Sequence, residues 1–158
     1  MAANASRLTR TMKNTRHIIT LIVRVIVAVV FLYAGFSKAG DPADFALAID
    51  RYRAVPHEVA VITALFLPWL EITCAIALFF KVLRAGATAL LTACSAVFVI
   101  MIAVALARGL DISCGCFGGD GDATGHASLA FSLARVLVLT AMCAWLLARE
   151  MKDLNEEK

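Results

Sequence analysis

Long runs of apolar residues, separated by short polar stretches, dominate this sequence. Four of the runs are long enough to cross a bilayer as helices, and they cover residues 17–36, 59–80, 85–107 and 128–148. At a rise of ~1.5 Å per residue, a helix of about 20 residues is ~30 Å long, which matches the hydrocarbon thickness of a membrane. The pattern therefore predicts an all-α membrane protein, built as a bundle of four transmembrane helices.

The same pattern predicts how the rest of the chain is organised. One transmembrane domain is expected over residues 17–148, with a basic tail at residues 1–16 and a short tail at residues 149–158. The connections between the runs are too short to hold another domain. The loops at residues 37–57 and 108–127 are expected to lie on the side of the membrane opposite both tails.

The distribution of basic residues predicts which side each loop faces. The two tails and the turn after the second run hold nine Lys and Arg: Arg7, Arg10, Lys13, Arg16, Lys81, Arg84, Arg149, Lys152 and Lys158. The other two loops hold four: Lys38, Arg51, Arg53 and Arg108. By the positive-inside rule, both termini are expected in the cytoplasm, an N-in/C-in topology. In a bacterial inner membrane the other two loops then face the oxidising periplasm.

Composition supports the membrane assignment and excludes several classes of function. Hydrophobic residues make up 61% of the chain and charged residues only 17%, whereas soluble domains are about 25% charged. The net charge of +3 is too small and too scattered to predict nucleic-acid binding. The sequence has no glycine-rich phosphate loop, so nucleotide-driven transport is not expected. The lipid bilayer is therefore the first expected partner.

Three charged residues, Arg24, Glu71 and Arg135, fall inside three different apolar runs. Each costs at least ~2.5–3.5 kcal/mol at the centre of a membrane helix, so we expect them to face one another inside the bundle. Pro68 adds a free carbonyl oxygen there, because it cannot donate a backbone hydrogen bond to Ala64. Two interpretations stay open: a structural ion-pair cluster, or a polar pocket for an anionic or quinone-like ligand.

Cys114 and Cys116 form a Cys-Gly-Cys sequence just after the third run. Two thiols one residue apart can close a disulfide only over a very small ring. Strained, exposed disulfides are the labile or catalytic ones, whereas a structural disulfide is expected to close a longer loop. The spacing favours a catalytic redox pair. The alternatives are a thiolate site for copper(I) or zinc that includes His126, and an inert pair.

Three further cysteines, Cys74, Cys94 and Cys143, occur singly inside the runs. A cysteine in such a position behaves as a small hydrophobic residue, so we expect these three to serve packing.

Several segments together resemble the DoxX-like membrane proteins, and most closely their MauE branch, the methylamine utilisation proteins. The matching segments are Arg24, residues 31–38 (FLYAGFSK), Tyr52, Pro56, residues 67–71 (LPWLE), residues 108–109 (RG), residues 114–118 (CGCFG) and Arg135. The resemblance implies a four-helix, redox-associated membrane protein. It also implies a part in maturing periplasmic methylamine dehydrogenase, whose small subunit needs many disulfides.

These features favour an inner-membrane thiol–disulfide oxidoreductase that acts on a thiol-bearing periplasmic client through Cys114 and Cys116. Lys38, Pro68 and His126 are candidate assisting residues. The reduced pair is expected to be reoxidised by a partner protein or by a quinone, and the sequence leaves the direction of electron flow open. The alternatives are a non-catalytic scaffold or accessory subunit of a redox complex, and a metal-handling protein.

Overall fold

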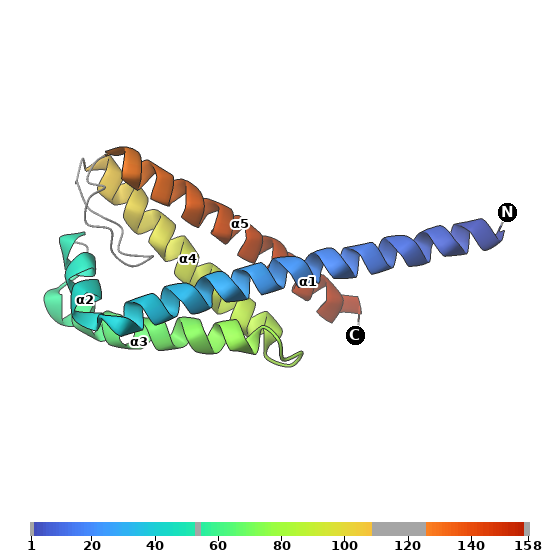
Figure 1. Ribbon diagram of the computed structural model, residues 1–158, viewed down its shortest axis with the longest axis horizontal. Coiled ribbons are helices and arrows are strands. Elements are labelled where there is room, and N and C mark those ends of the chain that lie inside the picture. Colours follow the sequence, from blue (N-terminus) through green and yellow to red (C-terminus); the bar gives the residue numbers. More distant parts are fainter. Residues whose placement is uncertain (1, 53–54, 109–125, 157–158) are drawn as a thin grey trace.

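The computed structural model describes residues 2–52, 55–108 and 126–156. In these residues the chain forms helices and no strands, arranged as shown in Figure 1: α1 (Ala2–Gly40), α2 (Pro42–Arg51), α3 (His57–Ala77), α4 (Arg84–Ala107) and α5 (His126–Glu156). Four segments are long and apolar enough to cross a membrane: His17–Gly40, His57–Ala77, Arg84–Ala107 and Ser132–Lys152. The predicted architecture is confirmed: the protein is an all-α, multi-pass membrane protein.

The bundle is built from two helix pairs. α4 packs mainly on α5, and α1 packs mainly on α3. Both termini lie at the same end of the bundle, which we call the terminal end (Figure 1). The opposite end, which we call the loop end, carries α2, the last residues of α4 and the first residues of α5. This arrangement is the one that four consecutive spans require.

The main core occupies the half of the bundle nearer the termini, where all four long helices meet. Its buried members are Val27, Ala28, Phe31, Cys74, Ala75, Leu78, Ala87, Leu91, Cys143 and Leu146. Large side chains from each helix interleave with alanines from the others, which lets the helix backbones approach closely. Many of the remaining apolar side chains are exposed. In a membrane these exposed side chains meet lipid.

The prediction of an open loop over residues 37–57 is wrong, because this stretch contains the end of α1 and all of α2. α1 continues to Gly40, and Asp41 caps α2 by accepting a hydrogen bond from the backbone N–H of Asp44 at 3.0 Å. α2 then packs an apolar face on α3, and the buried residues of this contact are Phe45, Ala46, Ile49, Ala60 and Ala64. A ten-residue amphipathic helix is too short and too polar to stand out as an apolar run.

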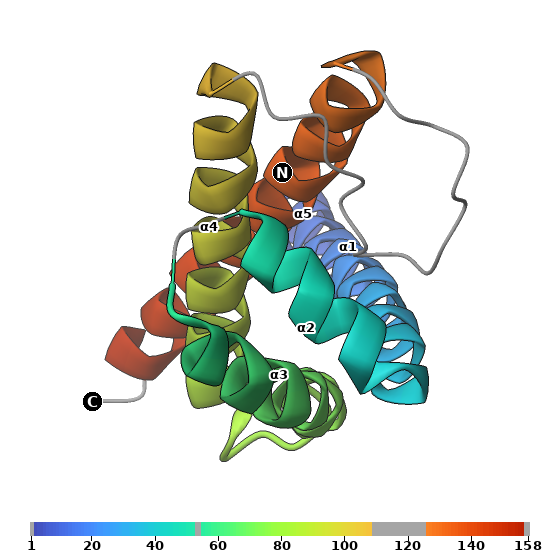
Figure 2. The same ribbon diagram turned by 90° about the vertical axis from the view of Figure 1, so that its left-hand side faces the viewer.

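The two helix pairs diverge toward the loop end, and α2 lies between them. Figure 1 shows α4 and α5 separating from α1 and α3 in that direction, and Figure 2 shows α2 between α3 and α4. Direct contact between α3 and α4 is accordingly less extensive than contact within either pair. This divergence positions α2, α3 and α4 around the cavity that is described next.

Candidate functional site

A lysine and a glutamate form an ion pair deep inside the bundle. Lys38, in the last turn of α1, donates hydrogen bonds from Nζ to both carboxylate oxygens of Glu71 in α3, at 2.8 and 2.9 Å. The two side chains are only 3% and 1% exposed. Because isolated charges are very costly to bury, each side chain depends on the other.

Close contact between α1 and α3 brings this pair together. Gly35 lies one turn before Lys38, and a Cβ atom at Gly35 would lie 2.7 Å from Ile72 Cγ1 and 3.1 Å from the carbonyl oxygen of Pro68. Any larger residue at this position would push the two helices apart. Glycine at position 35 therefore sets the helix separation that the Lys38–Glu71 pair needs, and the predicted assisting residue Pro68 contributes the backbone that Gly35 faces.

Two aromatic rings surround the ammonium group of Lys38. Its Nζ lies 4.6 Å from the ring centroid of Phe98 in α4 and 5.3 Å from that of Phe45 in α2. These distances are within the range of cation–π attraction, which is stronger for a desolvated cation. The ammonium group therefore has two hydrogen bonds to Glu71 and two aromatic rings within cation–π range.

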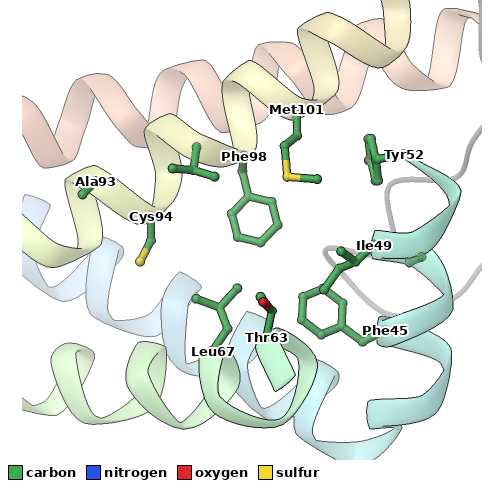
Figure 3. A pocket seen from close by; sticks show the side chains of 11 residues that line it. Phe45, Ile49, Tyr52, Thr63, Leu67, Ala93, Cys94, Phe98 and Met101 are labelled. Atoms are coloured by element: carbon green, nitrogen blue, oxygen red, sulfur yellow. The ribbon is translucent and has the colours of Figure 1, made fainter. Parts of the chain in front are cut away.

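An apolar cavity of about 270 Å³ adjoins these two rings (Figure 3). Side chains of α2, α3 and α4 line it: Phe45, Ala48, Ile49, Tyr52, Thr63, Leu67, Ala93, Cys94, Val97, Phe98 and Met101. In Figure 3, Cys94, Phe98 and Met101 point from α4 toward Leu67 of α3. Because Phe45 and Phe98 line the cavity and also contact the Lys38 ammonium, the ion pair lies directly behind an aromatic wall of the cavity.

One side of the cavity reaches the outer surface of the bundle. Val97 is 56% exposed, and Ala93 on the preceding turn of α4 is exposed as well. In a membrane this surface faces lipid, so an apolar molecule dissolved in the bilayer has a lateral route into the cavity.

A second group of charged side chains lies at the terminal end. Arg24 of α1 donates to Glu150 Oε1 of α5, and Arg84 Nη1, at the start of α4, lies 3.8 Å from Glu150 Oε2. We call these residues the Arg24–Glu150–Arg84 group. The Nε atom of Arg84 is buried and has no hydrogen-bond partner among the described residues. One carboxylate therefore serves two guanidinium groups, and the group carries a surplus positive charge.

The predicted cluster of Arg24, Glu71 and Arg135 is wrong in its pairing. Arg24 pairs with Glu150, Glu71 pairs with Lys38, and Arg135 lies at an exposed position of α5. The prediction placed Lys38 in a loop and Glu150 in a tail, because both lie outside the apolar runs. Helices α1 and α5 continue past those runs, which brings both residues into the bundle. Lys38 lies three residues after Gly35 in α1, on the same side of the helix. A helical projection would have placed Lys38 on the side of α1 that packs on α3.

The remaining predicted site residues lie largely beyond what the structure describes. Cys114 and Cys116 lie outside the described residues, so their roles stay predictions. His126 is the first residue of α5, and its side chain is likewise not described. The described residues contain no group of three or more His, Cys, Asp or Glu suited to a metal ion.

The three single cysteines occupy two kinds of position. Cys74 and Cys143 are buried in the main core, consistent with a packing role. Cys94 lines the cavity, where the sequence indicated no special environment. All three are free thiols.

The cavity can hold an uncharged apolar molecule, and the Lys38–Glu71 pair lies behind its aromatic wall. The pair is neutral overall. Hydrogen bonds in such an apolar environment are stronger than in water. The sequence predicted a polar intramembrane feature, but it did not indicate the cavity or the residues that form it.

Comparisons with known proteins place these residues in a known group. Residues 16–149 match the family model described as "Methylamine utilisation protein MauE". A curated relative, the methylamine utilization protein MauE of Methylophilus methylotrophus, is 33% identical over 99 residues, which are 62% of this chain and 52% of the relative. The chain thus spans about half the length of that relative, and no solved structure matches it. The predicted resemblance to MauE is confirmed, and the wider DoxX-like relationship stays a prediction.

Proposed function

Because the chain belongs to the MauE family of methylamine utilisation proteins, we propose that it is a membrane thiol–disulfide redox protein. In this proposal, Cys114 and Cys116 exchange with the thiols of a periplasmic client protein. The observation that carries the proposal is the Cys-Gly-Cys spacing. A disulfide over so small a ring is strained, and strained disulfides are the reactive ones.

The orientation that this function needs is supported by the charge distribution. The connection between α4 and α5, which holds both cysteines, starts and finishes at the loop end of the bundle (Figure 1). Lys38 is buried in an ion pair within α1, and Arg84 is largely buried beside Glu150, so neither counts as a loop charge. In the sequence, eight basic residues then remain in the tails and the α3–α4 turn, and three remain in the other two connections, which favours a periplasmic loop end.

The chemical step is an exchange of thiols for a disulfide. A client thiolate attacks one sulfur of the oxidised Cys114–Cys116 pair, and a mixed disulfide forms as the other sulfur leaves as a thiolate. A second client thiolate then attacks the mixed disulfide, which releases the client disulfide and leaves both cysteines reduced. The client loses two electrons and two protons, and the pair gains them, so the pair must be reoxidised before the next cycle.

Methylamine dehydrogenase is the client that the family membership favours. The curated relative is named for methylamine utilisation. The small subunit of this periplasmic enzyme needs many disulfides, and a dedicated membrane oxidant would supply them. The protein would then act during maturation of the dehydrogenase and not on methylamine itself.

Trapping the mixed disulfide tests the proposal directly. In Cys116→Ser, the Cys114 thiolate can still attack a disulfide of the client, the reverse of the exchange above, and one client sulfur leaves as a thiolate. The mixed disulfide should persist, because Cys116 is missing and cannot attack the Cys114 sulfur to release the client. The test expresses the full chain in a bacterium that makes methylamine dehydrogenase, quenches thiols with acid and alkylation, and identifies the adduct by non-reducing electrophoresis and mass spectrometry. Cys74→Ser is the matched control, because Cys74 is a free thiol in the main core and does not line the cavity.

The expected result is an adduct with Cys116→Ser that is absent from Cys74→Ser and from the double variant Cys114→Ser/Cys116→Ser. Dehydrogenase maturation should fail in both variants that lack a cysteine of the pair, while membrane insertion continues. If the double variant still supports full maturation, the redox function is wrong and a non-catalytic scaffold is the better account.

A further inference from the structure

We propose that the Arg24–Glu150–Arg84 group at the terminal end binds the phosphate of one anionic phospholipid, and that Arg84 makes the direct contact. The ligand is a phosphodiester with one net negative charge, carried on acyl chains. This inference goes beyond the proposed redox function and does not depend on it, because it uses neither cysteine of the Cys-Gly-Cys pair.

The guanidinium group of Arg84 lacks the hydrogen bonds that a largely buried arginine needs. Its contact with Glu150, 3.8 Å from Nη1 to Oε2, is an ion pair that is longer than a hydrogen bond. The Nε atom of Arg84 is buried and has no hydrogen-bond partner in the part of the chain that the structure describes. Buried polar groups nearly always have a partner, and a bound ion is one of the few explanations where the protein provides none. Arg84 can therefore use an acceptor from outside the described residues.

The charge of the group indicates that this acceptor is an anion. Arg24 and Arg84 each carry one positive charge and Glu150 carries one negative charge, so the net charge is +1. Glu150 accepts a hydrogen bond from Arg24, which leaves Arg84 with the weaker contact. Surplus charge that is partly buried is costly. One bound monoanion would cancel it, whereas a ligand without net charge would not.

Arg84 is the member of the group that a ligand can reach from the surface. Its side chain is 22% exposed, compared with 9% for Arg24 and 10% for Glu150. A long arginine side chain can turn toward the surface, and in doing so Arg84 gives up no hydrogen bond to Glu150. The planar guanidinium then presents its N–H groups as a fork that matches two oxygens of a phosphate.

The position of the group along the helices matches the depth of lipid phosphates. Arg84 is the first residue of α4 and of the apolar span Arg84–Ala107. Glu150 lies two residues before the end of the span Ser132–Lys152. Both residues therefore lie where the hydrocarbon region gives way to the head groups. Basic pockets between transmembrane helices at this depth are suited to anionic head groups.

The residues before Arg84 favour a lipid over a soluble anion. The α3–α4 connection carries Phe80, Val82 and Leu83, and all three side chains are exposed. Acyl chains attached to the bound phosphate can cover these apolar side chains, which adds a hydrophobic contribution to binding. Inorganic phosphate gains nothing from them. The ligand that fits both the charge and the apolar surroundings is an anionic phospholipid such as phosphatidylglycerol.

Native mass spectrometry can count the lipids that stay bound to the full chain. The protein is released from micelles that contain phosphatidylglycerol, phosphatidylethanolamine or phosphatidylcholine over a series of concentrations. One phosphatidylglycerol should remain bound per chain. The other two lipids should bind about tenfold more weakly, because a zwitterion leaves the surplus charge uncompensated. Equal binding of all three lipids would overturn the inference.

Arg84→Gln removes the direct contact and leaves Arg24 and Glu150 as a balanced pair. Its affinity for phosphatidylglycerol should fall about tenfold to a hundredfold, as expected for losing hydrogen bonds from a charged donor. Lys152→Gln is the matched control, because it removes the same charge from an exposed position at the same end. A basic residue that acts only through the surface potential changes affinity by roughly fivefold, so the control should lose no more than that. Equal losses in the two variants would indicate diffuse attraction, and the site would be wrong.

Unfolding by SDS separates lost binding from lost structure. Without lipid, Arg84→Gln should unfold at the same SDS concentration as the native chain, because the substitution leaves no unmatched charge. Phosphatidylglycerol should then protect the native chain against SDS but not the variant, since only a bound ligand stabilises the folded state. The comparison of the three lipids uses the native chain, so it decides the inference even if the variant is unstable.

Inorganic phosphate and glycerol 3-phosphate test the source of the bound phosphate. Neither compound carries acyl chains, so a large excess of either should leave phosphatidylglycerol bound to the native chain. Displacement by either compound would mean that the group takes a soluble anion, and the lipid assignment would be wrong. These measurements record lipid binding and the trapping experiment records a mixed disulfide, so failure of one proposal leaves the other intact.

Discussion

The bundle contains two buried groups of charged side chains, and they offset the cost of burying charge in different ways. Lys38 follows Arg24 by fourteen positions in α1, which is ~21 Å along a helix. The Lys38–Glu71 pair is neutral, almost completely buried and surrounded by aromatic rings. The Arg24–Glu150–Arg84 group carries a surplus positive charge and lies near the ends of α4 and α5, where Arg84 keeps partial exposure.

This difference indicates different roles. Arginine with several donors suits the terminal end, where it can contact a carboxylate and also reach water or lipid phosphate. Lys38 is buried deep in the bundle and cannot reach water or lipid phosphate, so its charge must be matched by Glu71. The first group joins α1 to the start of α4 and the last turns of α5, whereas the second lies behind the aromatic wall of the cavity. The predictions below test whether the two groups differ as described.

Removing the carboxylate of the deeper pair should have the largest effect. Glu71→Gln leaves the Lys38 ammonium buried without a counter-charge, which should lower the free energy of unfolding by about 3–5 kcal/mol. The measurement is unfolding by SDS from mixed micelles, followed by circular dichroism. Glu58→Gln, at an exposed position of the same helix, is the control and should change little.

A second change should partly restore that loss. Adding Lys38→Met to Glu71→Gln removes the unmatched charge, so the double variant should be more stable than Glu71→Gln alone. The buried Lys38–Glu71 pair would be contradicted if Glu71→Gln were as stable as the native chain, or if the double variant were no more stable than Glu71→Gln.

Removing the carboxylate at the terminal end should cost less. Glu150→Gln leaves two arginines unmatched, but Arg84 keeps partial exposure and can reach water or lipid phosphate, so we expect a loss of about 2 kcal/mol. The same SDS unfolding measurement applies, with Lys152→Gln, an exposed residue of the same helix, as the control. The comparison fails if Glu150→Gln costs more than Glu71→Gln.

A change of helix spacing should affect only the deeper pair. Gly35→Ala puts a methyl group 2.7 Å from Ile72 Cγ1, and forcing extra volume into a packed contact should cost about 1–2 kcal/mol after the gain in helix propensity. Gly86→Ala is the matched control, since nothing lies within 4 Å of a Cβ there, and it should be neutral or slightly stabilising. Unchanged stability in Gly35→Ala would argue against the close contact.

An exposed polar contact between His57 and Asp50 provides the lower limit of the comparison. His57 Nδ1 lies 3.2 Å from Asp50 Oδ2, and the two side chains are 64% and 39% exposed. Asp50→Asn should therefore change the free energy of unfolding by about 0–1 kcal/mol. A loss as large as that of Glu71→Gln would show that burial does not separate these pairs.

Hydropathy alone determined the number of spans and the all-helical class. A run of about 20 apolar residues has one stable form in lipid, a helix that satisfies its own backbone hydrogen bonds. This reasoning needs no knowledge of neighbouring helices, and it placed the four spans close to where the structure has them. The order of motifs such as residues 67–71 and 114–118 was likewise enough to indicate the family.

The tertiary structure decided which charges meet. Glu71 has Lys38 as its partner because α1 continues beyond its apolar run and Gly35 lets it approach α3. Glu150 joins Arg24 because α5 continues beyond its own apolar run. An ion pair between residues far apart in sequence depends on helix ends, rotation and separation together, and none of these follows from the apolar runs.

The cavity also depends on the tertiary structure. Its lining comes from α2, α3 and α4, and α2 was not predicted because ten residues of mixed character do not form a recognisable apolar run. The space exists because the two helix pairs diverge toward the loop end and α2 packs on α3 between them. The sequence determines whether each segment is more stable in lipid or in water, whereas the shape of a cavity depends on how several segments pack together.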